Sequence, residues 1–178
     1  MTHDFEEVYF LGNEITIFID GRVEQVGKRD DVFLKPRSKR VAQFLGAKNL
    51  YRAKILGNEE LSHRLILGVD GLQFSIPRGL YQQEMEVGKE VDLFIRPEEV
   101  MILREGKSVK DALKQNIFEG EILDIAGKER YQTVYFQTTL GKILFEISIP
   151  NYAFRNLNLS TGKKVSIALR EESLWVMS

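Results

Sequence analysis

The chain has 178 residues, of which 43% are hydrophobic, and it carries no cysteine and a formal net charge of -1. A chain of this length can bury one or two small cores, so the composition excludes intrinsic disorder. The lack of cysteine excludes a disulfide framework and thiolate chemistry, and the near-neutral charge provides no global attraction to nucleic acid or to an anionic membrane. Apolar runs are too short to cross a bilayer and the N-terminus has no signal-peptide pattern, so we expect a soluble protein, and the lack of cysteine fits a reducing cytoplasm.

The first 27 residues predict a short helix followed by a pair of strands. Apolar residues in 5–11 recur near helical spacing, and Gly12 provides a stop. Two β-prone runs, 14–19 and 22–27, flank Asp20-Gly21, a dipeptide typical of a two-residue hairpin turn. We expect an antiparallel hairpin here.

Residues 28–48 predict two short helices. The run 28–34 looks helical and must end before Pro36, because proline disfavours the helical conformation of its predecessor. Ser38 can cap a second helix, which Gly46 ends. The segment 1–48 therefore has α/β character.

From Asn49 onward one β-rich pattern occurs twice. The copies open with Asn49-Leu50-Tyr51 and Asn116-Ile117-Phe118, 67 residues apart. Ser-Ile-Pro follows in each copy, at residues 75–77 and 148–150, and suggests an offset that grows to 73. A matching pair of segments, 88–96 and 162–170, closes each copy.

Short strands and turn residues at this spacing are typical of small barrels. We predict a mainly β protein with two tandem, five-stranded, OB-like barrels, in lobes 49–106 and 107–178, after the α/β segment 1–48. The polar stretch 104–115 is expected to connect the two lobes.

Several motifs, in their order, resemble the C-terminal part of ABC-transporter ATP-binding proteins. Thr2-His3-Asp4 resembles the switch-histidine loop of the ATPase domain, and residues 41–46 (Val-Ala-Gln-Phe-Leu-Gly) resemble its end. Ile95-Arg96-Pro97-Glu98 resembles a signature of the transport-associated OB (TOBE) domain. The resemblance covers essentially the whole chain, is closest to the molybdate and tungstate import group, and implies TOBE/MOP-like lobes after a remnant of the ATPase domain.

The same resemblance implies that this chain is not an enzyme by itself. It has no Gly-x-x-x-x-Gly-Lys-Ser/Thr loop to hold phosphates, so ATP and magnesium are expected only in a full-length parent ATPase. His3 matches the switch histidine of the parent, and no catalytic residue or cofactor is expected here. His63 has no second ligand at metal-binding spacing, so we expect no metal site.

The molybdate branch of this family suggests a binding site for a small oxyanion, held by peptide N–H groups, hydroxyls and lysine. The candidate residues are Lys48, Asn49, Ser75, Asn116 and Ser148. The starts of both copies depart from the Ser-Ala-Arg-Asn pattern of small molybdate binders. The alternative is that the two asparagines brace strand starts and the two serines fill strand positions.

The resemblance therefore implies a regulatory and dimerisation domain of an ABC importer ATP-binding subunit. Alternatives are a free-standing oxyanion-binding module or the regulatory domain of a sugar or polyamine importer. Expected partners are a second copy, the membrane permease through the parent ATPase, and a small oxyanion, with no nucleic acid and no direct membrane insertion. The parent complex would lie at the inner face of the cell membrane. Residues 1–27 should pair with a second copy or be poorly ordered, because their strands lack the sheet of the ATPase core.

Overall fold

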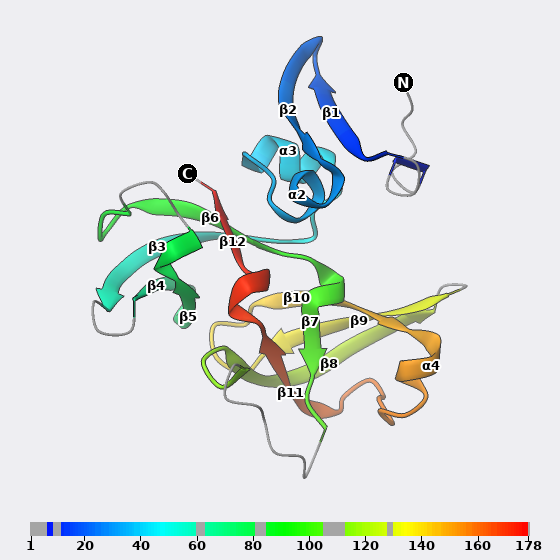
Figure 1. Ribbon diagram of the computed structural model, residues 1–178. Coiled ribbons are helices and arrows are strands. Elements are labelled where there is room, and N and C mark those ends of the chain that lie inside the picture. Colours follow the sequence, from blue (N-terminus) through cyan, green and yellow to red (C-terminus); the bar gives the residue numbers. More distant parts are fainter. Residues whose placement is uncertain are drawn as a thin grey trace.

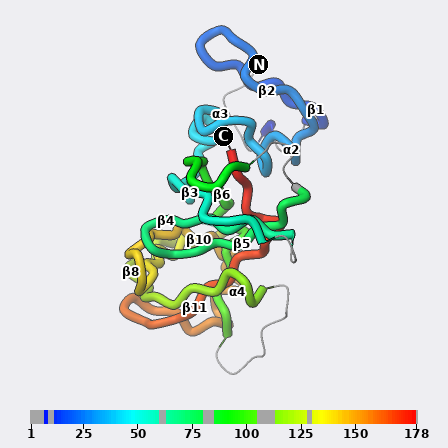
Figure 2. Tube along the Cα trace, turned by 90° about the vertical axis from the view of Figure 1, so that its left-hand side faces the viewer, coloured from blue at the N-terminus to red at the C-terminus, as the bar shows by residue number. Residues whose placement is uncertain are grey.

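The computed structural model describes residues 7–8, 12–59, 63–80, 85–104, 113–127 and 130–177. The protein is mainly β and has two parts: a small α/β unit at the top of Figure 1 and a larger β body below it. Figure 2 shows the same arrangement from the side, with the N-terminal hairpin at the far end from the β body.

The N-terminal unit is a β-hairpin packed on two short helices. Asp20 and Gly21 both have positive φ (51° and 74°), as the tight turn requires. Ile15 and Ile17 point to one face and are buried against the helices, which follows from the alternation of side chains along a strand. The elements are β1 (Glu14–Ile19), β2 (Arg22–Lys28), α2 (Arg29–Leu34) and α3 (Lys39–Phe44).

The predicted helix boundaries in this unit are confirmed. Helix α2 ends before Pro36. The Ser38 hydroxyl accepts a hydrogen bond from the Val41 N–H at 3.3 Å, which satisfies one of the unpaired donors of the first turn of α3. Gly46 follows with φ 77°. The predicted first helix lies mostly outside the described residues.

The β body consists of two five-stranded antiparallel sheets, as many strands as the repeat predicted for each copy. The first sheet has the order β12-β6-β3-β4-β5, and the second has the order β10-β9-β8-β11-β7. The first-sheet strands are β3 (Asn49–Glu59), β4 (Arg64–Val69), β5 (Leu72–Pro77), β6 (Glu90–Ile95) and β12 (Trp175–Met177). The second-sheet strands are β7 (Val100–Ile102), β8 (Ile117–Gly127), β9 (Tyr131–Thr138), β10 (Leu144–Pro150) and β11 (Lys164–Leu169). Short helical turns are η1 (Arg78–Leu80), η2 (Pro97–Glu99), α4 (Asn151–Phe154) and η4 (Glu171–Ser173).

The two copies exchange their last strands. Strand β7 belongs to the first copy by sequence but pairs with β11 of the second, Met101 opposite Ala168. Strand β12 ends the second copy but pairs with β6 of the first, Trp175 opposite Phe94. Each sheet therefore contains one strand from the other copy. The predicted boundary between lobes 49–106 and 107–178 stays a prediction about the sequence.

The ladders correct the predicted alignment of the copies. A β-bulge follows Ile55 in β3 and Ile122 in β8, so the starts of the copies match at 67 residues as predicted. Leu67 faces both Ile55 and Phe74, whereas Phe136 faces both Ile122 and Phe145. Phe74 therefore corresponds to Phe145, and the next residue of β5 corresponds to the next residue of β10.

Ser75 is consequently the counterpart of Glu146, and the predicted match of Ser75 with Ser148 is wrong by two residues. The physical reason is that strand pairing follows the buried phenylalanines. Burial alternates along β10, so a shift of two residues keeps each side chain on the same face. The Ser-Ile-Pro of β10 can therefore lie two residues further along its strand than that of β5.

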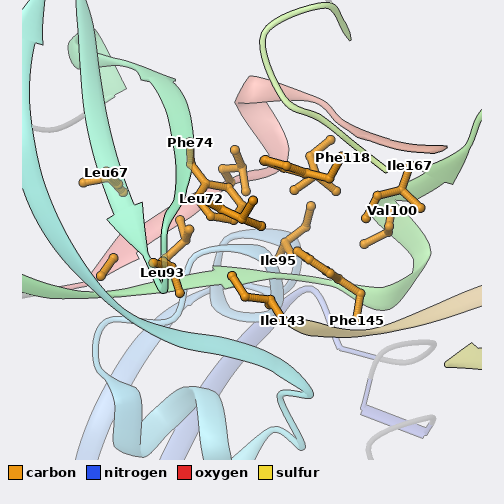
Figure 3. Packing of buried hydrophobic residues seen from close by; sticks show 14 of the residues in the cluster. Leu67, Leu72, Phe74, Leu93, Ile95, Val100, Phe118, Ile143, Phe145 and Ile167 are labelled. Carbon is orange, nitrogen blue, oxygen red and sulfur yellow. The ribbon is translucent and has the colours of Figure 1, made fainter. Parts of the chain in front are cut away.

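Both sheets contribute to one hydrophobic core. The Phe118 ring lies 4.8 Å from Phe74 of the first sheet and 6.5 Å from Phe145 of its own sheet. Figure 3 shows these rings together with Ile95 and Val100 between the strands. Each sheet therefore buries the inner face of the other.

Candidate functional site

Two buried asparagines bridge the two copies, and we call these bridges the asparagine clasps. Asn49 donates through Nδ2 to the Glu146 carbonyl at 2.8 Å and accepts through Oδ1 from the Glu146 N–H at 2.8 Å. Asn116 accepts through Oδ1 from the Ser75 N–H at 2.7 Å and donates through Nδ2 to the Ser75 carbonyl at 2.8 Å. The exposed fractions of Asn49 and Asn116 are 1% and 0%.

The clasps exist because β5 and β10 are edge strands of their sheets. An edge strand leaves backbone N–H and C=O groups without a ladder partner, and burying them unpaired is costly. A primary amide presents one donor and one acceptor side by side, so it pairs with both groups of one residue as a neighbouring strand would. Each copy thus begins with the residue that closes the edge of the other copy.

A charged cluster lies beside the Asn116 clasp. Arg64 on β4 donates through Nη1 to the Ser75 hydroxyl at 3.0 Å and to the carboxylate of Glu171 on η4. Both charged side chains are largely buried, with 25% and 13% exposed. The carboxylate neutralises the guanidinium and ties the exchanged end of the chain to the edge of the first sheet.

A tyrosine beside the Asn49 clasp is held in its neutral form. The Tyr51 hydroxyl donates to the Leu144 carbonyl at 2.7 Å, and its ring lies 5.2 Å from Phe145. Burial first, and then the charge of Glu146, raise the pKa of Tyr51 well above its usual range. The hydroxyl therefore remains a hydrogen-bond donor at physiological pH.

The exchanged strand β12 also contacts the N-terminal unit. The Trp175 indole N–H donates to the Pro36 carbonyl at 2.9 Å, and the Lys35 ammonium lies 5.8 Å from the centre of the indole ring. Met177 packs with Ala42 of α3. The C-terminal end of the chain, beside α3 in Figures 1 and 2, thereby joins the last copy to the α/β unit.

Comparisons with known proteins show that the chain is similar to ATP-binding proteins of importers. No protein-family model matches it. It is 32% identical over 176 residues to the molybdate/tungstate import ATP-binding protein WtpC of Pyrococcus horikoshii, covering 99% of this chain and 46% of that protein. It is 27% identical over 179 residues to the spermidine/putrescine import ATP-binding protein PotA of Borrelia garinii subsp. bavariensis, covering 99% and 44%. The chain is homologous to these import ATP-binding proteins.

The match to the import ATP-binding proteins lies in their C-terminal part, as the sequence motifs predicted. The chain spans about half the length of the curated relatives it matches, 46% for the first of them. Among solved structures it is similar to the cytoplasmic molybdate-binding protein ModG, with a TM-score of 0.60 and 15% identity, over 73% of this chain and 95% of that one. At this identity the likeness to ModG shows a shared TOBE-like fold.

The structure places the predicted site residues of this import-protein homologue around two clasps instead of in one pocket. Asn49 and Asn116 are the clasps, and Ser75 is bonded to Asn116 and Arg64. Lys48 is exposed and precedes the first clasp, whereas Ser148 is half-buried on β10, two residues beyond Glu146. Within the described part of the chain, neither the Lys48 ammonium nor the Ser148 hydroxyl has a hydrogen-bond partner.

Sequence reasoning missed the cluster of Arg64 and Glu171. No local signal in the sequence links two residues that are 107 positions apart. His3 lies outside the described residues. His63 is exposed in a turn with φ 51°, and among the described residues no three His, Asp or Glu side chains gather as a metal site would need. No helix in the described part is long and apolar enough to cross a membrane.

Proposed function

We propose that the chain is the regulatory and dimerisation domain at the C-terminus of an ABC importer ATP-binding subunit of the molybdate or tungstate type. The observation that carries the proposal is the 32% identity to the Pyrococcus import protein over 99% of this chain, through that protein's C-terminal part. In the proposal residues 1–48 are the end of the ATPase domain, and the two sheets are tandem OB-like barrels. The module itself is non-catalytic, while ATP and magnesium bind the parent ATPase.

The proposed partners follow from that placement. The parent would contact membrane permease subunits at the cytoplasmic face of the cell membrane, and a second copy would form a homodimer. Phe18, Val23 and Val26 support an association of the hairpin, because their exposed fractions are 48%, 54% and 61%. These side chains lie on a two-stranded sheet whose outer edges have no further strand among the described residues.

The proposed ligand is a tetrahedral oxyanion. The fold that the chain shares with the molybdate-binding protein ModG supports it. In this proposal the clasps of Asn49 and Asn116 hold the frame, since both amides already bind strand backbone. Lys48 and Ser148 flank the Asn49 clasp and supply a cation and a hydroxyl, while Ser75 occupies the corresponding edge at the Asn116 clasp.

A chimaera tests the regulatory role. The chain replaces the matching C-terminal part of the Pyrococcus horikoshii import protein, and ATP hydrolysis is measured with and without molybdate or tungstate. We expect the rate of ATP hydrolysis to fall when either anion is added. In the Lys48→Gln variant, the rate should no longer respond to the anions. Lys54→Gln is the matched control, since Lys54 is an exposed lysine on β3, six residues after Lys48. Hydrolysis that never responds to the anions would refute the proposal.

Two alternatives have an observation in their favour. The ModG likeness covers 95% of that chain, which also suits a free-standing oxyanion-binding module. The spermidine/putrescine relatives suit a polyamine importer. A chimaera that responds to spermidine but not to molybdate would favour the polyamine importer. Anion binding by the chain, without any association with an ATPase domain, would favour the free-standing module.

A further inference from the structure

The second sheet carries an open groove with a volume of about 710 Å³. The groove lies between the end of β7, the starts of β8 and β11, and the loop that follows α4. None of the predicted site residues lines it. Its size falls in the range of about 300–1,000 Å³ that is typical of sites for organic ligands, and a single tetrahedral oxyanion would leave most of it empty.

The charged groups of the groove favour an anion. Arg104, Lys163 and Lys164 line it, against one carboxylate, Glu119. Within the described part of the chain, no carboxylate oxygen lies within 4 Å of any of these three cations. The whole chain has a net charge of -1, so the excess of positive charge is local to the groove.

The loop after α4 positions one of the cations. Asn158 has φ 47°, and its carbonyl accepts a hydrogen bond from the Lys163 ammonium at 3.1 Å. The backbone of Lys163 is itself fixed, because its carbonyl accepts from the Ile122 N–H at 3.0 Å. An ammonium has three N–H donors, so Lys163 can donate two further hydrogen bonds to a ligand.

Apolar and amide side chains complete the groove. Leu103, Leu157 and Leu159 provide apolar surface, and the side chains of Asn156 and Asn158 provide donors and acceptors. A basic rim next to leucine side chains suits a molecule that has anionic groups at one end and a ring or other apolar body at the other.

The first copy does not repeat this chemistry, although its backbone does. Lys89 corresponds to Lys163, since its carbonyl accepts from the Ile55 N–H at 2.9 Å as that of Lys163 does from the equivalent isoleucine. Next to it, however, Arg52 pairs with Glu90 and Asp92. Among the described residues of the first copy, these charges are therefore neutralised within the protein, whereas the cations of the groove in the second copy are not.

We propose that this groove binds an organic anion of nucleotide size, with phosphate groups against Arg104, Lys163 and Lys164 and the ring on Leu157 and Leu159. The site goes beyond the oxyanion response described above. A phosphorylated metabolite bound at the second sheet could then regulate the same domain. This proposal does not depend on whether Lys48 and Ser148 bind molybdate.

The test uses the whole 178-residue chain and the fluorescent nucleotide mant-ATP without magnesium, at fixed ionic strength. We expect saturable binding that unlabelled ATP competes away and that equal concentrations of inorganic phosphate or molybdate do not. Lys163→Gln removes a charged hydrogen-bond donor and should weaken binding about tenfold. Glu119→Gln removes the opposing charge and should strengthen it.

Lys89→Gln is the matched control, because it removes the corresponding lysine of the first copy and should change the affinity less than about twofold. Circular dichroism melting confirms that each variant folds. The proposal is overturned by an absence of saturable binding, by equal losses in Lys163→Gln and Lys89→Gln, or by phosphate that competes as well as ATP. Loss of the molybdate response with nucleotide binding intact would refute the proposed function and leave this site standing.

Discussion

Removing the Asn116 clasp should destabilise the whole β body. Asn116→Ala leaves the N–H and the carbonyl of Ser75 without partners in a site where the asparagine is 0% exposed. Each of these two buried unpaired groups costs about 1–3 kcal/mol, so the free energy of unfolding should fall by about 2–6 kcal/mol. For a chain of this size the melting temperature should fall by roughly 10 °C.

The measurement is urea unfolding followed by the fluorescence of the single tryptophan, Trp175, which lies on β12 of the first sheet. Asn156→Ala is the control. Its amide makes one exposed hydrogen bond, to the Tyr152 carbonyl at 3.2 Å, so the change should cost less than about 0.5 kcal/mol. An Asn116→Ala protein as stable as this control would show that the clasp contributes nothing and refute the reasoning.

Asn116→Asp sharpens the same prediction. The carboxylate keeps an acceptor for the Ser75 N–H but has no donor for the Ser75 carbonyl, and burial disfavours its charge. Burial should raise the folded-state pKa above the unfolded value of about 3.9, so the protonated acid is favoured in the native state. The variant should therefore be more stable below the unfolded pKa and lose stability as the pH rises through the folded one. A flat dependence would contradict the assigned donor.

Three further predictions follow from single contacts. Gly141 has φ 70°, and a Cβ there would come within 2.3 Å of the Asp70 carbonyl oxygen. Gly162 has a similar φ of 82°, but its Cβ would have no atom closer than 3.9 Å. In urea unfolding, Gly141→Ala should therefore lower the free energy of unfolding by about 1 kcal/mol or more beyond the loss in Gly162→Ala. Trp175→Phe removes the indole hydrogen bond to the Pro36 carbonyl, which contributes about 1 kcal/mol to stability. Backbone amides of the N-terminal hairpin should therefore exchange hydrogen about fivefold faster. Unchanged exchange would contradict a stabilising role of this contact. Burial raises the pKa of Tyr51 above its ordinary value of 10.0, so the tyrosine contributes stability below that pH that is lost as the pH rises above it, and Tyr51→Phe should flatten this alkaline loss.

The local elements of the fold could be predicted from the sequence because their signals are local. Asp20-Gly21 determines the first hairpin turn, and Ser38 and Pro36 mark the helix boundaries that the structure has. The repeat that begins at Asn49 and Asn116 predicted two tandem five-stranded barrels, and the structure has two five-stranded sheets. These features depend on backbone conformation within a few residues, which composition and spacing record.

The exchange of strands could not be predicted in the same way. Strands β7 and β12 are three residues long, and their alternation is satisfied equally by pairing within their own copy or with the other. The choice depends on packing across the shared core. The contacts of the asparagines could not be predicted for a related reason. An amide next to a strand can bind an anion or a backbone, and the sequence does not show that Asn49 lies against Glu146 and Asn116 against Ser75.

The most direct measurement of the central claim is the melting temperature of the chain with molybdate, tungstate, sulfate and spermidine in turn. A ligand at about 1,000 times its Kd stabilises the native state by about 4 kcal/mol, which for this size is a shift of roughly 10 °C. The account predicts such a shift with molybdate or tungstate, and a much smaller one with sulfate and spermidine. Equal melting temperatures in all four solutions, or a shift with spermidine alone, would contradict it.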